Sequence, residues 1–247
     1  MLEIKGLTKH FNGVHAVDDV SFRIDKSSIT SLIGPNRAGK TTLFNIICGY
    51  IESDKGYATF EGEKLNGSAP HAIASLGIGR TFQNLRLIGK LSSLDNIMLA
   101  FGNRRSGGFL GALTRSISRK EEEKNRSKSF EHLEFVGLIE KADEPAGTLS
   151  YGQQKLLSLA CCLALDAKLL LLDEPVAGVN QETITRILSL LEKLRDGGLT
   201  IFIIEHNLDA VMKVSNRLIV MDEGRIIADG VPQVVKENPA VIEAYLS

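Results

Sequence analysis

The chain has 247 residues, and its 29 Lys and Arg side chains nearly balance its 30 Asp and Glu side chains. With 43% hydrophobic residues the composition is that of a globular protein, which excludes a collagen-like chain, a disordered acidic tail and a disulfide scaffold. The near-zero net charge argues against a protein that coats nucleic acid.

No membrane span or signal peptide is expected. The longest apolar runs, such as Leu169–Leu172, fall far short of the roughly 20 residues that cross a bilayer. Charged and apolar residues alternate at the N-terminus, unlike a signal peptide. Cys48, Cys161 and Cys162 lack metal-ligand spacing, so we expect reduced thiols in a protein core.

Strands and helices alternate at both ends of the chain. Strands are expected within the first 33 residues and then over Gly56–Glu61, Gly77–Phe82, Leu169–Leu172, Thr200–Ile204 and Leu218–Met221. Helices are expected over Gly39–Cys48, Glu182–Leu194, Val231–Glu237 and Ala240–Leu246. This alternation predicts an α/β fold with a mostly parallel sheet and helices on both faces.

The middle of the chain, from about Asn84 to Ala164, has a helical pattern without a convincing strand. A loop is expected over residues 103–118 and a charged helix from about Ser118 to Val136. The helical middle is therefore predicted to be an insertion between two halves of the sheet.

A glycine-rich segment follows the apolar run Ser28–Ile33. It matches the G-x-x-x-x-G-K-[ST] pattern, in which backbone N–H groups and a helix N-terminus meet phosphate. Lys40 would reach the β- and γ-phosphates, and the Thr41 hydroxyl would bind Mg²⁺. The predicted nucleotide-binding residues here are Gly34, Pro35, Asn36, Arg37, Ala38, Gly39, Lys40, Thr41 and Thr42.

Two carboxylates end the apolar run Leu169–Leu172. Asp173 would hold Mg²⁺, and Glu174 could orient or deprotonate an attacking water. Alone, such a pair is more often a solvated strand-end turn. The upstream phosphate loop favours the catalytic interpretation.

Seven features in order resemble those of ATP-binding cassette (ABC) ATPases. Beside the phosphate loop and the Asp-Glu pair, these are Phe11, Gln83, the signature-like Leu149–Gln154, Ala177–Asn180 and His206, and the ordered set is far more specific than any one of them. The resemblance implies that Phe11 stacks on adenine, although a core position is the alternative for a lone aromatic residue. It implies that Gln83 senses Mg²⁺ and water, and that His206 bonds the γ-phosphate.

The signature implies a second subunit. In this family Ser150 and the N–H of Gly152 would contact the γ-phosphate of ATP held by the partner, so that ATP joins two subunits. Four further segments resemble the larger ATPase subunit of bacterial branched-chain amino acid importers: Gly79–Leu87, Phe135–Leu138, Pro145–Gly152 and Asn238–Leu246.

The resemblance implies a single nucleotide-binding domain over residues 1–247. Residues 1–83 and 165–247 would form the ATP-binding core with an antiparallel β subdomain, and 84–164 the helical signature subdomain. It further implies ATP and Mg²⁺ as ligands, two membrane permeases and a second ATPase subunit as partners, and a substrate-binding protein that acts indirectly. Nucleic acid is not expected as a partner, and the location would be the cytoplasmic face of the plasma membrane.

Some residues depart from the family pattern. Arg37 stands where glycine is usual, and a positive φ there would cost about 1–2 kcal/mol. Asn180 replaces a common aspartate, and Ser158 and Cys161 replace a Glu and an Arg of the signature helix. Three alternatives stay open: a related ABC system for urea, amides or lipopolysaccharide, a soluble cassette ATPase, and a degenerate regulatory subunit.

Overall fold

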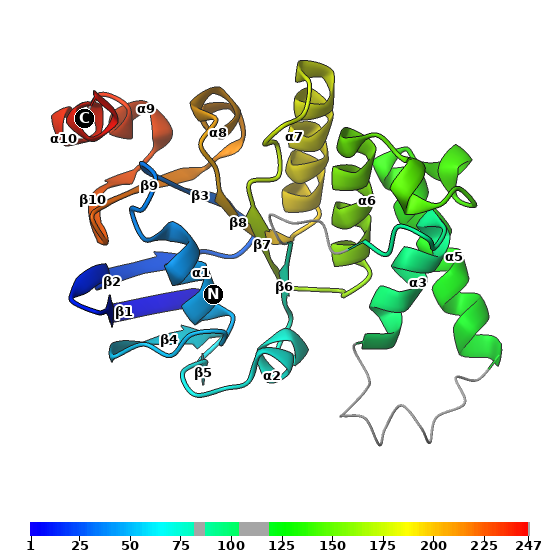
Figure 1. Ribbon diagram of the computed structural model, residues 1–247, viewed down its shortest axis with the longest axis horizontal. Coiled ribbons are helices and arrows are strands. Elements are labelled where there is room, and N and C mark those ends of the chain that lie inside the picture. Colours follow the sequence, from blue (N-terminus) through cyan, green and yellow to red (C-terminus); the bar gives the residue numbers. More distant parts are fainter. Residues whose placement is uncertain (82–86, 104–118, 247) are drawn as a thin grey trace.

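The computed structural model describes residues 1–81, 87–103 and 119–246. Two sheets lie next to each other at one side of the molecule, and a group of helices lies at the other (Figure 1). The smaller sheet is antiparallel, in the order β2 (Val14–Ile24), β1 (Leu2–Phe11), β4 (Lys55–Phe60) and β5 (Glu63–Lys64). Asn12 and Gly13 both have positive φ, as a two-residue hairpin turn between β1 and β2 requires.

The larger sheet has six strands. Their order is β10 (Arg225–Gly230), β9 (Arg217–Asp222), β3 (Ile29–Ile33), β8 (Thr200–Ile204), β7 (Leu169–Asp173) and β6 (Ile78–Arg80). All neighbouring strands are parallel except β10, which runs antiparallel to β9. Every residue of β3, β7 and β8 is buried, as expected for strands covered on both faces.

Strand β7 shows how the sheet divides two cores. Leu169 and Leu171 pack with α1 (Lys40–Ile47) and the smaller sheet, whereas Leu170 and Leu172 pack toward α7 (Gln181–Asp196). Successive strand side chains point to opposite faces, so a four-leucine run fills both cores. Helix α1 therefore lies between the two sheets.

The helical part consists of α3 (Ser93–Asn103), α5 (Arg119–Val136) and α6 (Tyr151–Leu163), with short 3-10 turns at Ile139–Lys141 and Ala146–Thr148. Its buried side chains, such as Leu133 and Leu157, belong to the same apolar cluster as Ile187 and Leu191 of α7. Helix α6 thus joins the helical part to the sheet.

The predicted parallel sheet and helical middle are confirmed, and most boundaries agree within two residues. Four short elements were missed: β5, α2 (Pro70–Ser75), α8 (Leu208–Val214) and β10. The C-terminal helices are α9 (Pro232–Val235) and α10 (Pro239–Leu246). The strand predicted to reach Phe82 ends at Arg80 among the described residues, and the loop predicted over 103–118 falls almost wholly outside them. None of the helices described has the length and apolarity needed to span a membrane.

Candidate active site

The glycine-rich loop connects β3 to α1 and packs closely against other strands. A Cβ at Gly34 would lie 1.9 Å from the carbonyl oxygen of Met221, and one at Gly39 would lie 2.0 Å from that of Ala16. Gly39 has a φ of +99° and directly precedes α1, which begins at Lys40. Only glycine fits these two positions, and the loop leads directly into the N-terminus of α1, whose first N–H groups have no partner within the helix.

Lys40 is a buried cation inside this loop. Its side-chain Nζ donates hydrogen bonds to the carbonyl oxygens of Gly34, at 2.7 Å, and Pro35, at 2.8 Å. Burial lowers the pKa of Lys40, and the nearby charges of Glu174 and Asp173 act in the opposite direction. A buried ammonium group held by neutral carbonyls is well suited to bind a polyanion.

The carboxyl end of β7 brings the two predicted carboxylates to the same edge of the sheet. Asp173 is buried and pairs with Arg80 Nη2 at 3.1 Å. Glu174 has a φ of +51°, and its N–H donates to the carbonyl of Ile204 at 2.9 Å. Its Oε1 lies 3.0 Å from His206 Nε2, so the predicted base and the predicted histidine are in contact.

Two buried charged residues that the sequence did not single out hold this edge together. Lys155 of α6 donates a 2.6 Å hydrogen bond to the carbonyl oxygen of Glu174, and burial lowers its pKa. Glu205 accepts hydrogen bonds from the N–H groups of Val176, at 2.8 Å, and His206, at 3.0 Å. Their one sequence signal is a charged residue inside or directly after an apolar segment.

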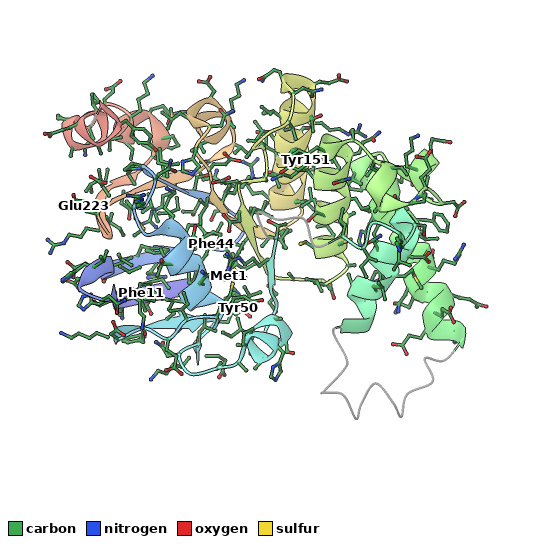
Figure 2. All side chains as sticks on the ribbon, viewed as in Figure 1. Met1, Phe11, Phe44, Tyr50, Tyr151 and Glu223 are labelled. Atoms are coloured by element: carbon green, nitrogen blue, oxygen red, sulfur yellow. The ribbon has the colours of Figure 1, made fainter. Side chains whose placement is uncertain are left out.

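The signature segment forms the N-terminus of α6. Ser150 caps the helix: its hydroxyl accepts from Gln153 N at 3.3 Å, and the Gln153 side chain accepts from Ser150 N at 2.9 Å. Gly152 lies against α7, where an added Cβ would be 3.0 Å from Thr183 Oγ1. Figure 2 shows Tyr151, beside these residues, well apart from Phe11 and from Phe44 of α1. The signature is therefore not brought to the loop of its own chain.

The remaining predicted residues differ in how exposed the structure leaves them. Phe11 is 42% exposed at the end of β1, with Lys9 Nζ at 5.4 Å from its ring centroid, so the core alternative is excluded. Thr41 is exposed and Thr42 half-buried in the first turn of α1. Arg37 is exposed and has a φ of +72°, so the positive φ that is expected to strain a non-glycine residue is present. Gln83 lies outside the described residues.

Comparison with known proteins points to one family. The profile of the ABC transporter family matches residues 17–177, and that of the branched-chain amino acid ATP-binding cassette transporter matches residues 225–246. The high-affinity branched-chain amino acid transport ATP-binding protein BraF of Pseudomonas aeruginosa is 38% identical over 100% of this chain and 97% of its own length. The probable branched-chain amino acid transport ATP-binding protein LivG of Archaeoglobus fulgidus is 39% identical over 100% of this chain and 95% of its own.

Solved structures show the same fold. A nucleotide-free ATP-binding cassette from an ABC transporter superposes with a TM-score of 0.88 at 33% identity, covering 100% of this chain and 99% of that one. The ADP conformation of an ATP-binding cassette superposes with a TM-score of 0.87 at 34% identity, covering 100% and 98% of the two chains. The chain belongs to the ABC transporter family, as one of its ATP-binding cassette ATPases.

Proposed function

We propose that this cassette binds and hydrolyses ATP to power an importer of branched-chain amino acids. The observation that carries the proposal is the meeting, at one edge of the sheet, of the buried Lys40 with the Glu174–His206 pair. A loop that binds phosphate and a carboxylate that activates water are the two parts that phosphoryl transfer to water requires.

For ATP binding, we assign the triphosphate to residues 34–42 and the adenine to Phe11. Lys40 carries the positive charge, and the N-terminus of the eight-residue α1 adds N–H donors directed at the phosphates. Phe11 presents an exposed ring beside the Lys9 ammonium group, and an exposed aromatic face at a strand end is suited to stacking on a base.

The residues at the loop and at β7 fit Mg²⁺. Thr41 offers a hydroxyl oxygen and Asp173 a carboxylate, the hard oxygen ligands that Mg²⁺ prefers. Bound Mg²⁺ neutralises phosphate charge during transfer. We propose that Thr41 and Asp173, directly or through water, hold the ion, and that Gln83 completes the set.

For hydrolysis, we assign the general base to Glu174. Three contacts hold Glu174 in place. Its N–H donates to the carbonyl of Ile204, its own carbonyl accepts from Lys155, and its carboxylate contacts His206. A base within hydrogen-bond reach of its proton contributes rate by position as well as by pKa. His206 then orients the Glu174 carboxylate and bonds the γ-phosphate.

We propose that two cassettes complete one another. Ser150 and Gly152 flank Tyr151 at the N-terminus of α6, and Figure 2 shows Tyr151 well apart from Phe44 of α1, the helix that follows the phosphate loop. Their hydroxyl and N–H groups can serve a phosphate only if it is held by a second subunit. Helix α6 has 13 residues, so its N-terminal dipole adds to this interaction.

A groove between the sheet and the helical part suits a permease segment. Its volume is about 280 Å³, and it is lined by Arg80, Thr81 and mainly apolar residues of the helical part, among them Ile88 and Leu99. Ile88 is 50% and Leu99 49% exposed. Large apolar side chains left at the mouth of a groove indicate a protein contact. We propose that this groove binds one membrane permease. A pair of cassettes would then bind two permeases.

We propose that the protein lies at the cytoplasmic face of the plasma membrane, bound to its permeases. Residues 1–83 and 165–247 would act as the ATP-binding core, and 84–164 as the helical signature subdomain that moves with the partner. The names of the relatives support branched-chain amino acids as cargo. A substrate-binding protein would supply specificity from outside.

The test is purification of the tagged chain from mildly solubilised native membranes, followed by mass spectrometry. We expect two permeases, a second cassette ATPase and an amino-acid-binding protein, with ATPase activity in the complex. A urea-, amide- or lipopolysaccharide-related permease would change the cargo but keep the transport function. Recovery of soluble ribosomal or nucleic-acid partners alone would refute the transport function and leave the ATP site intact.

A further inference from the structure

Arg80 is a buried cation beside the proposed metal site. Its Nη2 lies 3.1 Å from Asp173 Oδ2, and the two side chains are only 8% and 6% exposed. Its Nη1 donates to Asn45 Oδ1 at 2.7 Å. The guanidinium carbon lies 5.7 Å from the ring centroid of Phe44 and 5.9 Å from that of Tyr50, two residues labelled in Figure 2. Groups on α1, β7 and the segment after α1 therefore fix its direction.

Thr81, the residue after Arg80, also binds the end of β7. The Thr81 N–H donates to the carbonyl of Leu171 at 2.9 Å, and the Asp173 N–H donates to Thr81 Oγ1 at 3.1 Å. Arg80 and Thr81 thus bind the end of β7 through three contacts, one from the Arg80 side chain and two from Thr81. Arg80 and Thr81 lead directly into the segment that contains Gln83.

The pairing leaves the carboxylate able to bind a metal. A carboxylate has about four lone-pair sites on two oxygens, and the Arg80 contact uses Oδ2. Among the described residues, Lys40 and Lys155 experience the charge of Asp173 without forming an ion pair with it. Arg80 is the cation that fixes the rotation of the carboxylate, so it determines where the other oxygen points.

We propose that Arg80 is a positioning residue for Mg²⁺: it holds Asp173 in the orientation that the ion requires. The inference rests on the proposed role of Asp173 as a metal-binding group. Its basis is geometry as well as charge, because a planar guanidinium spans Asp173 and Asn45 at once, and a lysine ammonium does not have this fork.

The test compares Arg80→Lys and Arg80→Met with the parent chain. A fluorescent ATP analogue is bound first in EDTA, and Mg²⁺ is then added to find its half-saturating concentration without relying on hydrolysis. Outer-shell partners of metal ligands typically change metal affinity about 10–100-fold. We expect an increase of that size in half-saturating Mg²⁺ for both variants, and less than a twofold change in the analogue's Kd in EDTA, because Arg80 faces Asp173 rather than the phosphate loop.

Two variants serve as controls. Asn45→Ala removes the second acceptor and leaves the Arg80–Asp173 pair, so we expect a smaller shift in the same direction. Arg217→Met removes another Arg–Asp pair of the same sheet, with contacts of 2.6 Å to Asp229, and should leave the Mg²⁺ requirement unchanged. If Arg80→Met fails to fold, Arg80→Lys and Asn45→Ala still decide the question.

The outcomes separate this inference from the proposed function. Parent-like Mg²⁺ half-saturation in both Arg80 variants overturns the positioning role. A parent-like value in Arg80→Lys alone shows that charge suffices and overturns the geometric argument. Tighter Mg²⁺ binding in either variant shows that Arg80 competes with the ion and overturns it as well. If the parent chain fails to bind the analogue at all, the proposed ATP site is refuted instead.

Discussion

Arg37 places a side chain where the backbone is left-handed, with a φ of +72° in the phosphate loop. For a residue with a Cβ this region costs about 1–2 kcal/mol, whereas glycine occupies it freely. Arg37→Gly removes that cost but gives the unfolded chain more freedom, which is worth about 0.4–1 kcal/mol in the opposite direction. We therefore expect Arg37→Gly to raise the free energy of unfolding by about 1 kcal/mol.

The assay is thermal and urea unfolding of parent, Arg37→Gly and Arg37→Ala. For a chain of this size about 1 kcal/mol corresponds to a rise of about 2–4 °C in Tm. Arg37→Ala removes the guanidinium but keeps the Cβ and its strain, so its Tm should stay close to the parent value. The difference between Gly and Ala at this one position isolates the backbone contribution.

The affinity of the same variants for ATP gives a second test. We expect Arg37→Gly to bind ATP more tightly than the parent chain, because its loop can close on phosphate without a Cβ. Arg37→Ala should bind more weakly than either, since it keeps the strain and loses a positive charge. Equal dissociation constants for Arg37→Gly and parent, together with equal stabilities of the Gly and Ala variants, would refute the reasoning.

Three other predictions follow from the site. Glu174→Gln should still bind ATP and lose about 10²–10⁴ in turnover, and near-full turnover would remove Glu174 as the base. Gly152→Ala places a methyl group 3.0 Å from Thr183 Oγ1, so we expect this crowding to offset the roughly 1 kcal/mol that alanine adds to a helix, and the gain to appear in unfolding experiments only together with Thr183→Ala. Burial raises the pKa of Cys48 to about 11 and of Cys162 to about 12, so both should resist maleimide at neutral pH until urea exposes them; labelling of the native chain would contradict this.

The parts of the site that follow a strand could be predicted from the sequence. Leu169–Leu172 is an uninterrupted apolar run ending in two acids, which is the pattern of a strand buried on both faces and open at its carboxyl end. The glycine-rich loop was predictable for the same reason, because its pattern and its flanking elements are local. Boundaries of such elements came within two residues of the structure.

The partners of those residues could not be predicted. Arg80 and Asp173 are 93 residues apart, and Val176 and Glu205 are 29 apart, so only the packing of β6, β7 and β8 brings them together. A charged residue at a strand end is ordinarily solvated, and nothing in a single sequence shows which one the fold will bury.

Short elements were missed for a different reason. Helices α2 and α8 have only six and seven residues, too few for a clear period. Each nevertheless carries a start signal: Pro70 opens α2, and Asn207 caps α8 through a 3.0 Å bond from Ala210 N. Capping residues can therefore locate helices that are too short for hydrophobic periodicity to reveal.

The strained backbone of Glu174 bonds to both the larger sheet and the helical part. A non-glycine φ of +51° persists only where neighbouring structure determines it, and here β8 supplies the carbonyl of Ile204 and α6 supplies Lys155. Lys155 lies on the same helix as Ser150, which we assign to the partner's phosphate. A helix that shifts as a rigid body carries both residues, so closure of the signature on ATP in the partner subunit would move a group bonded to the proposed base. The route from the signature to the proposed base is therefore short: Ser150 caps α6, and Lys155 of the same helix donates a 2.6 Å hydrogen bond to the carbonyl oxygen of Glu174.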